Sequence, residues 1–219
     1  MQRALIARCH VNPALFEELR ATRAPQLMPL TVSQFHEMIR TGILPDASSI
    51  ELIEGLLICK DRSAAGDDLM VHDPRHALLV TRLLELLIGW AKSIGCHVRV
   101  QLPVTLTSAS EPEPDLALVR GANDAFAKSH PAPGDLAAVF EVADSSLQFD
   151  RTAKTRLYAA AGIPIYWIIN LRESSIEVFM RPDPTTGTYS ERIEYRPGQR
   201  ISLYVNQHVL DVDVAGVLA

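Results

Sequence analysis

The chain has 219 residues, of which 47% are hydrophobic, so it can bury a sizeable core and fits one domain with decorations better than two. Its net charge of −5 means that the protein as a whole is not basic, so any contact with nucleic acid must come from a local basic patch or a bound cation. Cys9, Cys59 and Cys96 are far apart and form no CxxC motif. This spacing argues against a disulfide framework or a thiolate zinc site and fits a reducing cytoplasm.

We interpret residues 1–28 as an N-terminal arm and residues 29–219 as a single domain. Arg8, His10 and Pro13 interrupt the N-terminus before any apolar run is long enough for a signal peptide. No stretch reaches the roughly 18 consecutive apolar residues that a membrane helix needs. We therefore expect a cytoplasmic protein without a membrane partner.

In chain order, the first predicted element is a helix in TVSQFHEMIR, capped by Thr31 or Ser33 and ended by Gly42. The β-branched stretch IELIEGLLICK, with Gly55 at its centre, predicts a hairpin or a bulged strand pair. A Gly- and Asp-rich loop follows. The stretch PRHALLVTRLLELLIGWAKSIG then gives the longest helical pattern, with Pro74 near its first turn.

Three strands are predicted next, in HVRVQLPVTLT, PDLALV and DLAAVFEV, and the last has the composition of a strand buried on both faces. The stretch LQFDRTAKTRLYAAAG predicts a helix that stops at Gly162, and IPIYWIIN predicts another buried strand. SIEVFM and TYSERIEYR predict a hairpin across the turn-rich RPDPTTG. We expect an α/β fold in which helices flank a mixed central sheet.

Acidic side chains and a lysine lie beside these predicted elements. Asp115 begins one short strand and Glu141 lies near the end of another, so two carboxylates meet if the strands pair. Oxygen ligands of this kind suit Mg²⁺ or Mn²⁺. Lys154 follows Asp150 by four residues on one helical face, a spacing that also fits a simple surface ion pair. Near Glu141, its ammonium can orient or help deprotonate an attacking water, as phosphodiester hydrolysis requires.

The ordered motifs resemble the Uma2 family, also called DUF820, of the PD-(D/E)xK nuclease superfamily. They are PDLALV and FEVADSSLQFDRTAKTRLYAAAGIPIYWIIN, preceded by IELIEGLL and by His76 at the start of the long helix. The resemblance runs from about Pro29 to the C-terminus and implies a restriction-endonuclease-like fold. It also implies a catalytic set, with the acids of the PD and EV motifs binding metal and Asp150 supporting the helix lysine: Asp115, Glu141, Asp150 and Lys154.

The resemblance assigns further residues. The superfamily usually has a lysine two residues after the glutamate, but this chain has Ala143 there. The resemblance implies that Lys154 on the helix takes the role of that lysine. Glu54, with Glu51 as the less favoured choice, resembles the acid of the family's ELI-acid-Gly stretch and would add a metal ligand. His76 and Gln101 are candidates for contacts with phosphate or water.

Two other hydrolytic chemistries fit the sequence poorly. His72 and His76 have the i,i+4 spacing of a zinc helix, but Pro74 lies between them and no glutamate follows His72, so the HExxH pattern fails. Ser145 and Ser146 lack a GxSxG elbow, which argues against a serine hydrolase.

The sequence therefore predicts a Mg²⁺- or Mn²⁺-dependent endonuclease with DNA as substrate, and the resemblance adds a homodimer. One alternative is a catalytically silent copy of the fold that acts as a binding or assembly module. The acidic balance and the lack of a basic DNA-reading segment favour this alternative, whereas retention of all four catalytic residues favours the nuclease. A metal-dependent hydrolase of smaller phosphate esters is a third hypothesis.

Overall fold

The computed structural model describes residues 27–44, 50–59 and 74–219. Most of the predicted N-terminal arm and the Gly- and Asp-rich loop with His72 lie outside the described residues. In the part of the chain that is described, no helix combines the length and apolarity that a bilayer crossing requires.

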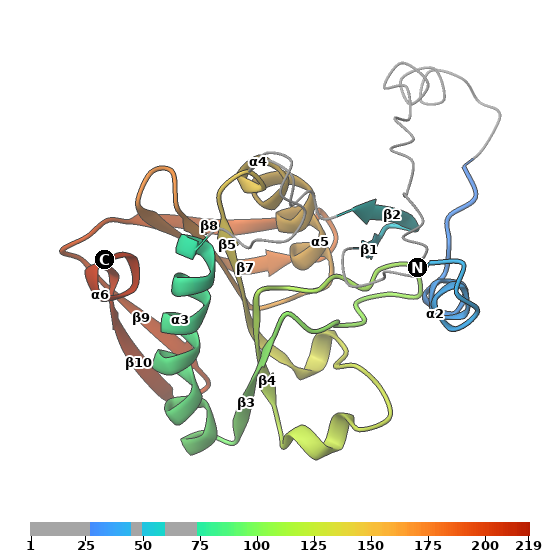
Figure 1. Cartoon of the computed structure of the whole chain (residues 1–219). Helices are drawn as coiled ribbons and strands as arrows, with labels where there is room; N and C mark the ends of the chain where they lie inside the picture. The colour runs from blue at the N-terminus through green and yellow to red at the C-terminus, as the bar shows by residue number, and fades with distance from the viewer. Residues whose placement is uncertain (1–26, 45–49, 60–73) are drawn as a thin grey trace.

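A six-stranded mixed sheet forms the centre of the molecule (Figure 1), in the order β3-β4-β5-β6-β7-β8. The neighbours β5 and β6 run parallel, and the other pairs of this sheet are antiparallel. Every residue of β5 is buried, as its apolar run predicts. The strands are β3 (Cys96–Val100), β4 (Leu116–Arg120), β5 (Leu136–Ala143), β6 (Ile165–Asn170), β7 (Ser175–Asp183) and β8 (Thr188–Tyr195). Two short 3-10 helices, η3 (Asn123–Phe126) and η4 (Pro133–Asp135), lie between β4 and β5.

One face of the sheet packs against the long helix α3 and a C-terminal hairpin (Figure 1). Side chains such as Phe140 and Trp167 point to this face and meet Leu83 and Leu87 of the helix in one buried cluster. The predicted long helix is confirmed. The elements on this face are α3 (Pro74–Ser93), β9 (Arg200–Val205), β10 (His208–Asp213) and α6 (Val214–Leu218).

The other face packs against the segment that connects β5 to β6. Val139 and Ile168 point to this face and share a buried cluster with Leu157 and Tyr158 of the connecting segment. This segment is not one regular α-helix, because a π-helical turn interrupts it, so the i,i+4 geometry expected from the sequence does not hold there. It consists of α4 (Leu147–Phe149), the π-helical η5 (Asp150–Lys154) and α5 (Thr155–Ala160).

A small hairpin lies beside this second face and is formed by β1 (Ile50–Ile53) and β2 (Leu56–Cys59). Its two turn residues, Glu54 and Gly55, have φ angles of 49° and 78°, which is the left-handed pattern of a type I′ turn. A Cβ on Gly55 would lie 2.2 Å from the Cβ of Pro29, so only glycine fits. The predicted hairpin is confirmed, with its turn at Glu54 and Gly55.

Helix α2 (Val32–Arg40) packs against this hairpin through a small cluster centred on Phe35 and Leu52. Of the two predicted caps, Thr31 is the one that forms. Its hydroxyl accepts a hydrogen bond from the Gln34 amide, and the Gln34 side chain accepts one from the Thr31 amide.

Two parts of the sequence interpretation differ from the structure. The strand predicted across HVRVQLPVTLT ends at Val100, because Gln101 has a φ of 49° and turns the chain out of the sheet just before Pro103. The hairpin β9–β10 was not predicted, although Ile201, Leu203 and Val205 alternate with exposed residues.

Candidate active site

Asp115 and Glu141 lie side by side at one end of β4 and β5. The antiparallel register pairs Leu116 with Phe140. Asp115, which precedes β4, therefore lies opposite Glu141, which follows Phe140. The backbone amide of Asp115 donates to Oε2 of Glu141 at 3.3 Å. The expected pairing of these two strands is therefore confirmed, and the two carboxylates share one edge of the sheet.

Three donors hold the Asp115 carboxylate. His76 Nε2 lies 3.1 Å from Oδ2, the Val142 amide donates to Oδ2 at 2.8 Å, and Gln101 Nε2 donates to Oδ1 at 3.2 Å. Burial acts to raise the pKa of Asp115, but His76, the Val142 amide and Lys154 outweigh it and hold that pKa below its ordinary value. The structure thus brings the predicted His76 and Gln101 to the site, where both contact a carboxylate.

The Glu141 carboxylate is buried and receives two donors on one oxygen. Lys154 Nζ and the Tyr158 hydroxyl each lie 2.8 Å from Oε1. The opposite oxygen, Oε2, faces the amide of Asp115. Tyr158 is fully buried in the core and was not among the predicted site residues. Its position four residues after Lys154, on the helix face that carries the lysine, was the available signal.

The hairpin contributes Glu51 to this cluster. Its Oε1 lies 3.4 Å from Lys154 Nζ and accepts the Glu113 amide at 2.8 Å, and its side chain is 2% exposed. Glu54 lies elsewhere: it occupies the turn, is 52% exposed and pairs with Arg156 at 3.0 Å. The structure therefore places Glu51, which the sequence made the less favoured choice, beside the lysine.

Asp150 is buried at the start of the π-helical turn. Its Oδ2 accepts the Ser146 hydroxyl at 2.6 Å, and its backbone carbonyl accepts the hydroxyls of Thr155 at 2.7 Å and Tyr166 at 3.2 Å. Burial raises the pKa of Asp150, and the charge of Lys154 opposes that rise. Asp150 thus acts on the lysine through charge, while the hydrogen bonds of its side chain go to Ser146.

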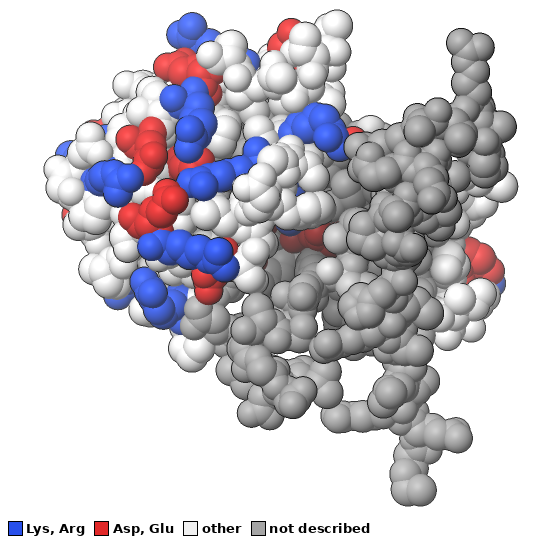
Figure 2. Space-filling model, turned by 90° about the horizontal axis from the view of Figure 1, so that it is seen from above, with Lys and Arg blue, Asp and Glu red and all other residues white. Residues whose placement is uncertain are grey.

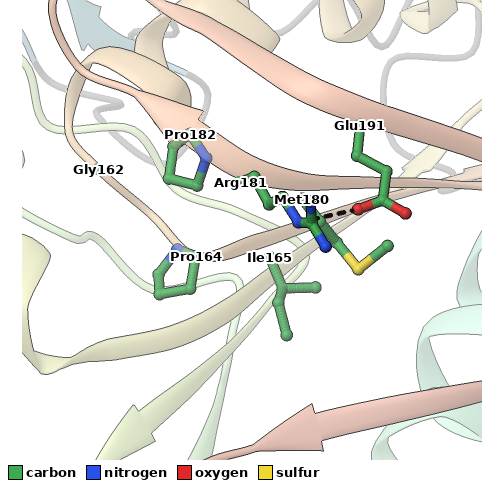
Figure 3. A pocket seen from close by; sticks show the side chains of 7 residues that line it. All are labelled: Gly162, Pro164, Ile165, Met180, Arg181, Pro182 and Glu191. Carbon is green, nitrogen blue, oxygen red and sulfur yellow. Dashed lines mark ion pairs between the residues drawn. The ribbon is translucent and has the colours of Figure 1, made fainter.

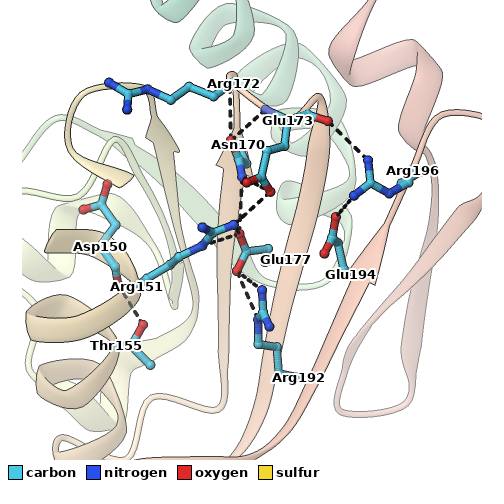
Figure 4. A network of polar contacts seen from close by, with 10 residues as sticks. All are labelled: Asp150, Arg151, Thr155, Asn170, Arg172, Glu173, Glu177, Arg192, Glu194 and Arg196. Atoms are coloured by element: carbon cyan, nitrogen blue, oxygen red, sulfur yellow. Dashed lines mark hydrogen bonds and ion pairs between the residues drawn. The ribbon is translucent and has the colours of Figure 1, made fainter. Parts of the chain in front are cut away.

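An ion-pair network fixes the π-helical turn against the sheet (Figure 4). Arg151 lies inside this turn and donates to Oε1 of Glu177 on β7 from Nε at 2.8 Å and from a terminal nitrogen at 2.6 Å. Arg192 on β8 donates to the other oxygen of Glu177 at 3.1 and 2.8 Å. The fully buried Glu177 carboxylate therefore anchors the segment that carries Lys154.

Together these side chains form a carboxylate cluster, in which four acids surround one lysine: Glu51, Asp115, Glu141, Asp150 and Lys154. Burial raises the pKa of Glu141 to about 8, against the charge of Lys154 and with the help of the neighbouring acids. Burial acts to lower the pKa of Lys154, but the acids outweigh it and raise that pKa well above its ordinary value. The neighbouring acids contribute to both shifts, and a bound cation would offset their charge.

The donor set fits a hard dication. Asp115 and Glu141 offer carboxylate oxygens, the ligands that Mg²⁺ and Mn²⁺ prefer. The Asp115 side chain is 14% exposed, so the cluster is in contact with solvent at that point. Among the described residues, the contact to Oε2 of Glu141 is the long 3.3 Å one from the Asp115 amide, which leaves this oxygen a lone pair for an ion.

A hollow lined by residues of β6, β7 and β8 lies apart from this cluster (Figure 3). It contains none of the five cluster residues, and its polar contact is the ion pair of Arg181 with Glu191 at 3.2 Å. We assign it no role in the chemistry.

The mixed sheet, the helical crossover between the parallel strands β5 and β6, and the acids at the sheet edge define a restriction-endonuclease-like protein. The fold is similar to that of a solved structure described as "a putative nuclease belonging to DUF820 from Anabaena variabilis ATCC 29413". The TM-score is 0.62 at 16% identity, and the match covers 87% of this chain and 98% of that chain.

Residues 32–213 match the Uma2 family, which is described as "Putative restriction endonuclease", and the chain belongs to this family. The predictions of family and fold are therefore confirmed, and membership places the chain among nuclease-like proteins. No curated protein matches the chain.

Proposed function

We propose that the protein is a Mg²⁺- or Mn²⁺-dependent endonuclease that hydrolyses phosphodiester bonds in DNA. One observation carries the proposal: Lys154 Nζ lies 2.8 Å from Glu141, whose other oxygen contacts the backbone of Asp115. Two carboxylates and one ammonium at a single point are the groups that this hydrolysis uses. Membership of a family described as "Putative restriction endonuclease" supports the same reaction.

In this proposal, Asp115 and Glu141 hold the ion, and Glu51 takes the supporting role predicted for Glu54. A bound dication would supply positive charge to the phosphate oxygens and lower the pKa of a water molecule. His76 and Gln101 fix the Asp115 carboxylate in its orientation through their contacts with its two oxygens.

Lys154 keeps the reacting groups in place. Its ammonium bonds Glu141 and Glu51 and lies where it can orient the attacking water and offset the charge that develops on the phosphate. The oxygen of that water forms a bond to phosphorus, and the bond to one sugar oxygen breaks. The products are a phosphate monoester and a sugar hydroxyl.

Acidic side chains on the surface would repel the phosphates of DNA, so binding requires positive charge close to the site. On the face shown in Figure 2, basic and acidic side chains are interleaved. Described ion pairs such as Arg172 with Asp144 at 2.9 Å and Arg196 with Glu194 at 2.6 Å neutralise several arginines. A bound dication would therefore supply part of the attraction for phosphate.

The test is nicking of supercoiled plasmid by the full chain with Mg²⁺, with Mn²⁺ and with excess EDTA. We expect cleavage only with an added dication, and a loss of roughly 10²–10⁴-fold in Glu141→Gln. Glu51→Gln should lower cleavage, and the exposed Glu54→Gln should retain it. Full cleavage in EDTA, or in Glu141→Gln, would reject the proposal.

A catalytically silent module remains a second candidate, because Lys154 is already paired with Glu141 and Glu51 within the chain. Calorimetric titration with Mg²⁺ and Mn²⁺ separates the two functions. The nuclease requires an ion site that Asp115→Asn removes, whereas the silent module predicts no heat from either ion. A parallel assay of nucleoside monophosphate hydrolysis tests the third hypothesis, a hydrolase of smaller phosphate esters.

A further inference from the structure

A second group of metal-ligating side chains lies outside the carboxylate cluster. It consists of His36 on α2, Glu111 in the segment before β4, and His130 in the segment between η3 and η4. One ligand atom from each residue lies within 4.8 Å of the other two. His36 Nε2 and Glu111 Oε1 are 2.5 Å apart. Three segments that are distant in the sequence therefore direct two imidazoles and one carboxylate to one point.

The carboxylate of this group is buried and held in orientation. Glu111 is 2% exposed, and its Oε2 accepts the Thr105 hydroxyl at 2.5 Å, which leaves Oε1 directed at His36. The Glu111 amide donates to the Leu52 carbonyl of β1 at 2.7 Å and fixes the backbone. A buried carboxylate requires a cationic partner, and a side chain held by a second hydrogen bond is preorganised as a ligand.

The two histidines suit a borderline transition metal better than a hard ion. Imidazole is a preferred ligand of Zn²⁺, whereas Mg²⁺ prefers sites made of oxygen alone. Burial lowers the pKa of His130, the direction that favours a ring able to bind a metal. The His36 side chain is 48% exposed, which gives an ion a route from solvent.

We propose that His36, Glu111 and His130 form a Zn²⁺ site that fastens α2 to the segments beside the central sheet. Three protein ligands leave the fourth tetrahedral position to water. A metal at this site would stabilise the position of α2, which otherwise packs through a small apolar cluster whose buried members are Phe35, Ile50 and Leu52. Through the Glu111 bond to Leu52, the site also holds the hairpin that carries Glu51.

Arg99 of β3 competes for the site. Its side chain is buried, and a terminal nitrogen lies 3.3 Å from His130 Nδ1. A guanidinium can only donate, so this contact occupies the Nδ1 lone pair, and its charge repels a dication. Within the described residues, the buried Nε of Arg99 has no hydrogen-bond partner. Zinc binding must displace this contact, so Arg99 sets the affinity of the site.

The test is titration of EDTA-treated full-length chain with Zn²⁺ alone, by calorimetry and by thermal unfolding. We expect one Zn²⁺ per chain at this site and a rise in Tm, with the affinity of this site reduced tenfold or more in His36→Ala and in His130→Ala. Because Zn²⁺ also binds carboxylate sites, the titration is repeated in Glu141→Gln, where the histidine-dependent binding should remain. His208→Ala on β10 should bind as the wild type does. Equal zinc affinity in the wild type and both histidine variants, or no binding at all, would overturn the proposal.

Two further measurements separate ligation from loss of structure. Co²⁺ in place of Zn²⁺ should give visible ligand-field absorption, and His36→Ala should lose it. Because the His36 side chain is half exposed, the same variant should keep the circular dichroism spectrum of the folded wild type. Arg99→Gln should bind Zn²⁺ at least several-fold more tightly, because it frees the Nδ1 of His130 and removes a charge. Weaker zinc binding in Arg99→Gln would contradict the proposal.

Discussion

Lys154 and Glu141 are 13 positions apart in the sequence, yet the ammonium of one lies 2.8 Å from the carboxylate of the other, and both are buried. The contact spans the connection from β5 to the π-helical turn. Because both groups are buried and each is the other's hydrogen-bond partner, changing one residue changes both the chemistry and the stability of the protein.

Replacing Lys154 by Met should lower plasmid cleavage by roughly 10²-fold or more, because the water loses its orienting group. The change also leaves Glu51 and Glu141 without their shared ammonium, at a cost of up to about 3–5 kcal/mol in the free energy of unfolding. Urea unfolding should therefore accompany the cleavage assay. Wild-type cleavage in a folded Lys154→Met protein would remove the lysine from the mechanism.

The raised pKa of Glu141 should make the stability of the EDTA-treated protein depend on pH. The folded-state pKa is about 8, whereas an unfolded glutamate has a pKa of about 4.3, so the folded protein holds an extra proton between these values. The stabilisation is complete below the unfolded value and is lost as the pH rises towards about 8. Urea midpoints from pH 5 to 9 should fall more steeply for the wild type than for Glu141→Gln.

The same proton should compete with Mg²⁺. Since Glu141 must lose its proton to bind an ion, the affinity for Mg²⁺ should rise with pH up to about 8, and protons should be released below that value. Calorimetry in two buffers of different ionisation enthalpy measures this release. An affinity that is independent of pH between 6 and 8 would contradict the role of Glu141 as a ligand.

Glu177→Gln should destabilise the protein by about 1–3 kcal/mol, because the buried acceptor of Arg151 and Arg192 loses its charge. Both arginines are partly exposed and recover water contacts, which limits the cost. The matched control is Glu173→Gln, whose side chain is 47% exposed and should change stability by less than about 0.5 kcal/mol. Equal urea midpoints for the two variants would show that the network does not anchor the turn.

Gly55→Ala should destabilise the protein by about 1–3 kcal/mol, because the new Cβ would overlap Pro29 and the φ of 78° disfavours alanine. The control is Gly89→Ala in the exposed middle of α3, where a Cβ meets no atom within 4 Å. That change should stabilise the protein by about 0.5–1 kcal/mol through helix propensity. Thermal and urea unfolding of both variants give the comparison.

The strands beside Asp115 and Glu141 could be predicted from sequence, because the hydrophobic pattern reveals them. Their pairing was a condition of the interpretation, supported by the family resemblance, and the structure confirms it. The choice between Glu51 and Glu54 could not be predicted, because it depends on a turn that puts a glutamate at positive φ, a conformation this residue rarely adopts. The π-helical turn at Asp150 was equally hidden, since one extra residue per turn leaves the apolar pattern of a short helix almost unchanged.

Residues joined only by tertiary contacts leave no motif at all. His36, Glu111 and His130 come from three separate segments, and their spacing in the sequence resembles no ligand pattern. The hairpin β9–β10 is a different case, because the sequence of β9 alternates apolar Ile201, Leu203 and Val205 with other residues, a pattern typical of a strand with one buried face. The C-terminal region was thus predictable in principle, whereas the histidine cluster required coordinates.

The Tyr158 hydroxyl has a consequence for ion selectivity. Since it and Lys154 both donate to Oε1 of Glu141, the two lone pairs of that oxygen are occupied, and only Oε2 can face an ion. In the proposed metal site, Glu141 would thereby be restricted to monodentate coordination. Ca²⁺ gains from carboxylates that chelate through both oxygens, whereas the smaller Mg²⁺ accepts one oxygen from each and keeps its waters. A tyrosine that touches no ion would then discriminate between the two alkaline-earth metals.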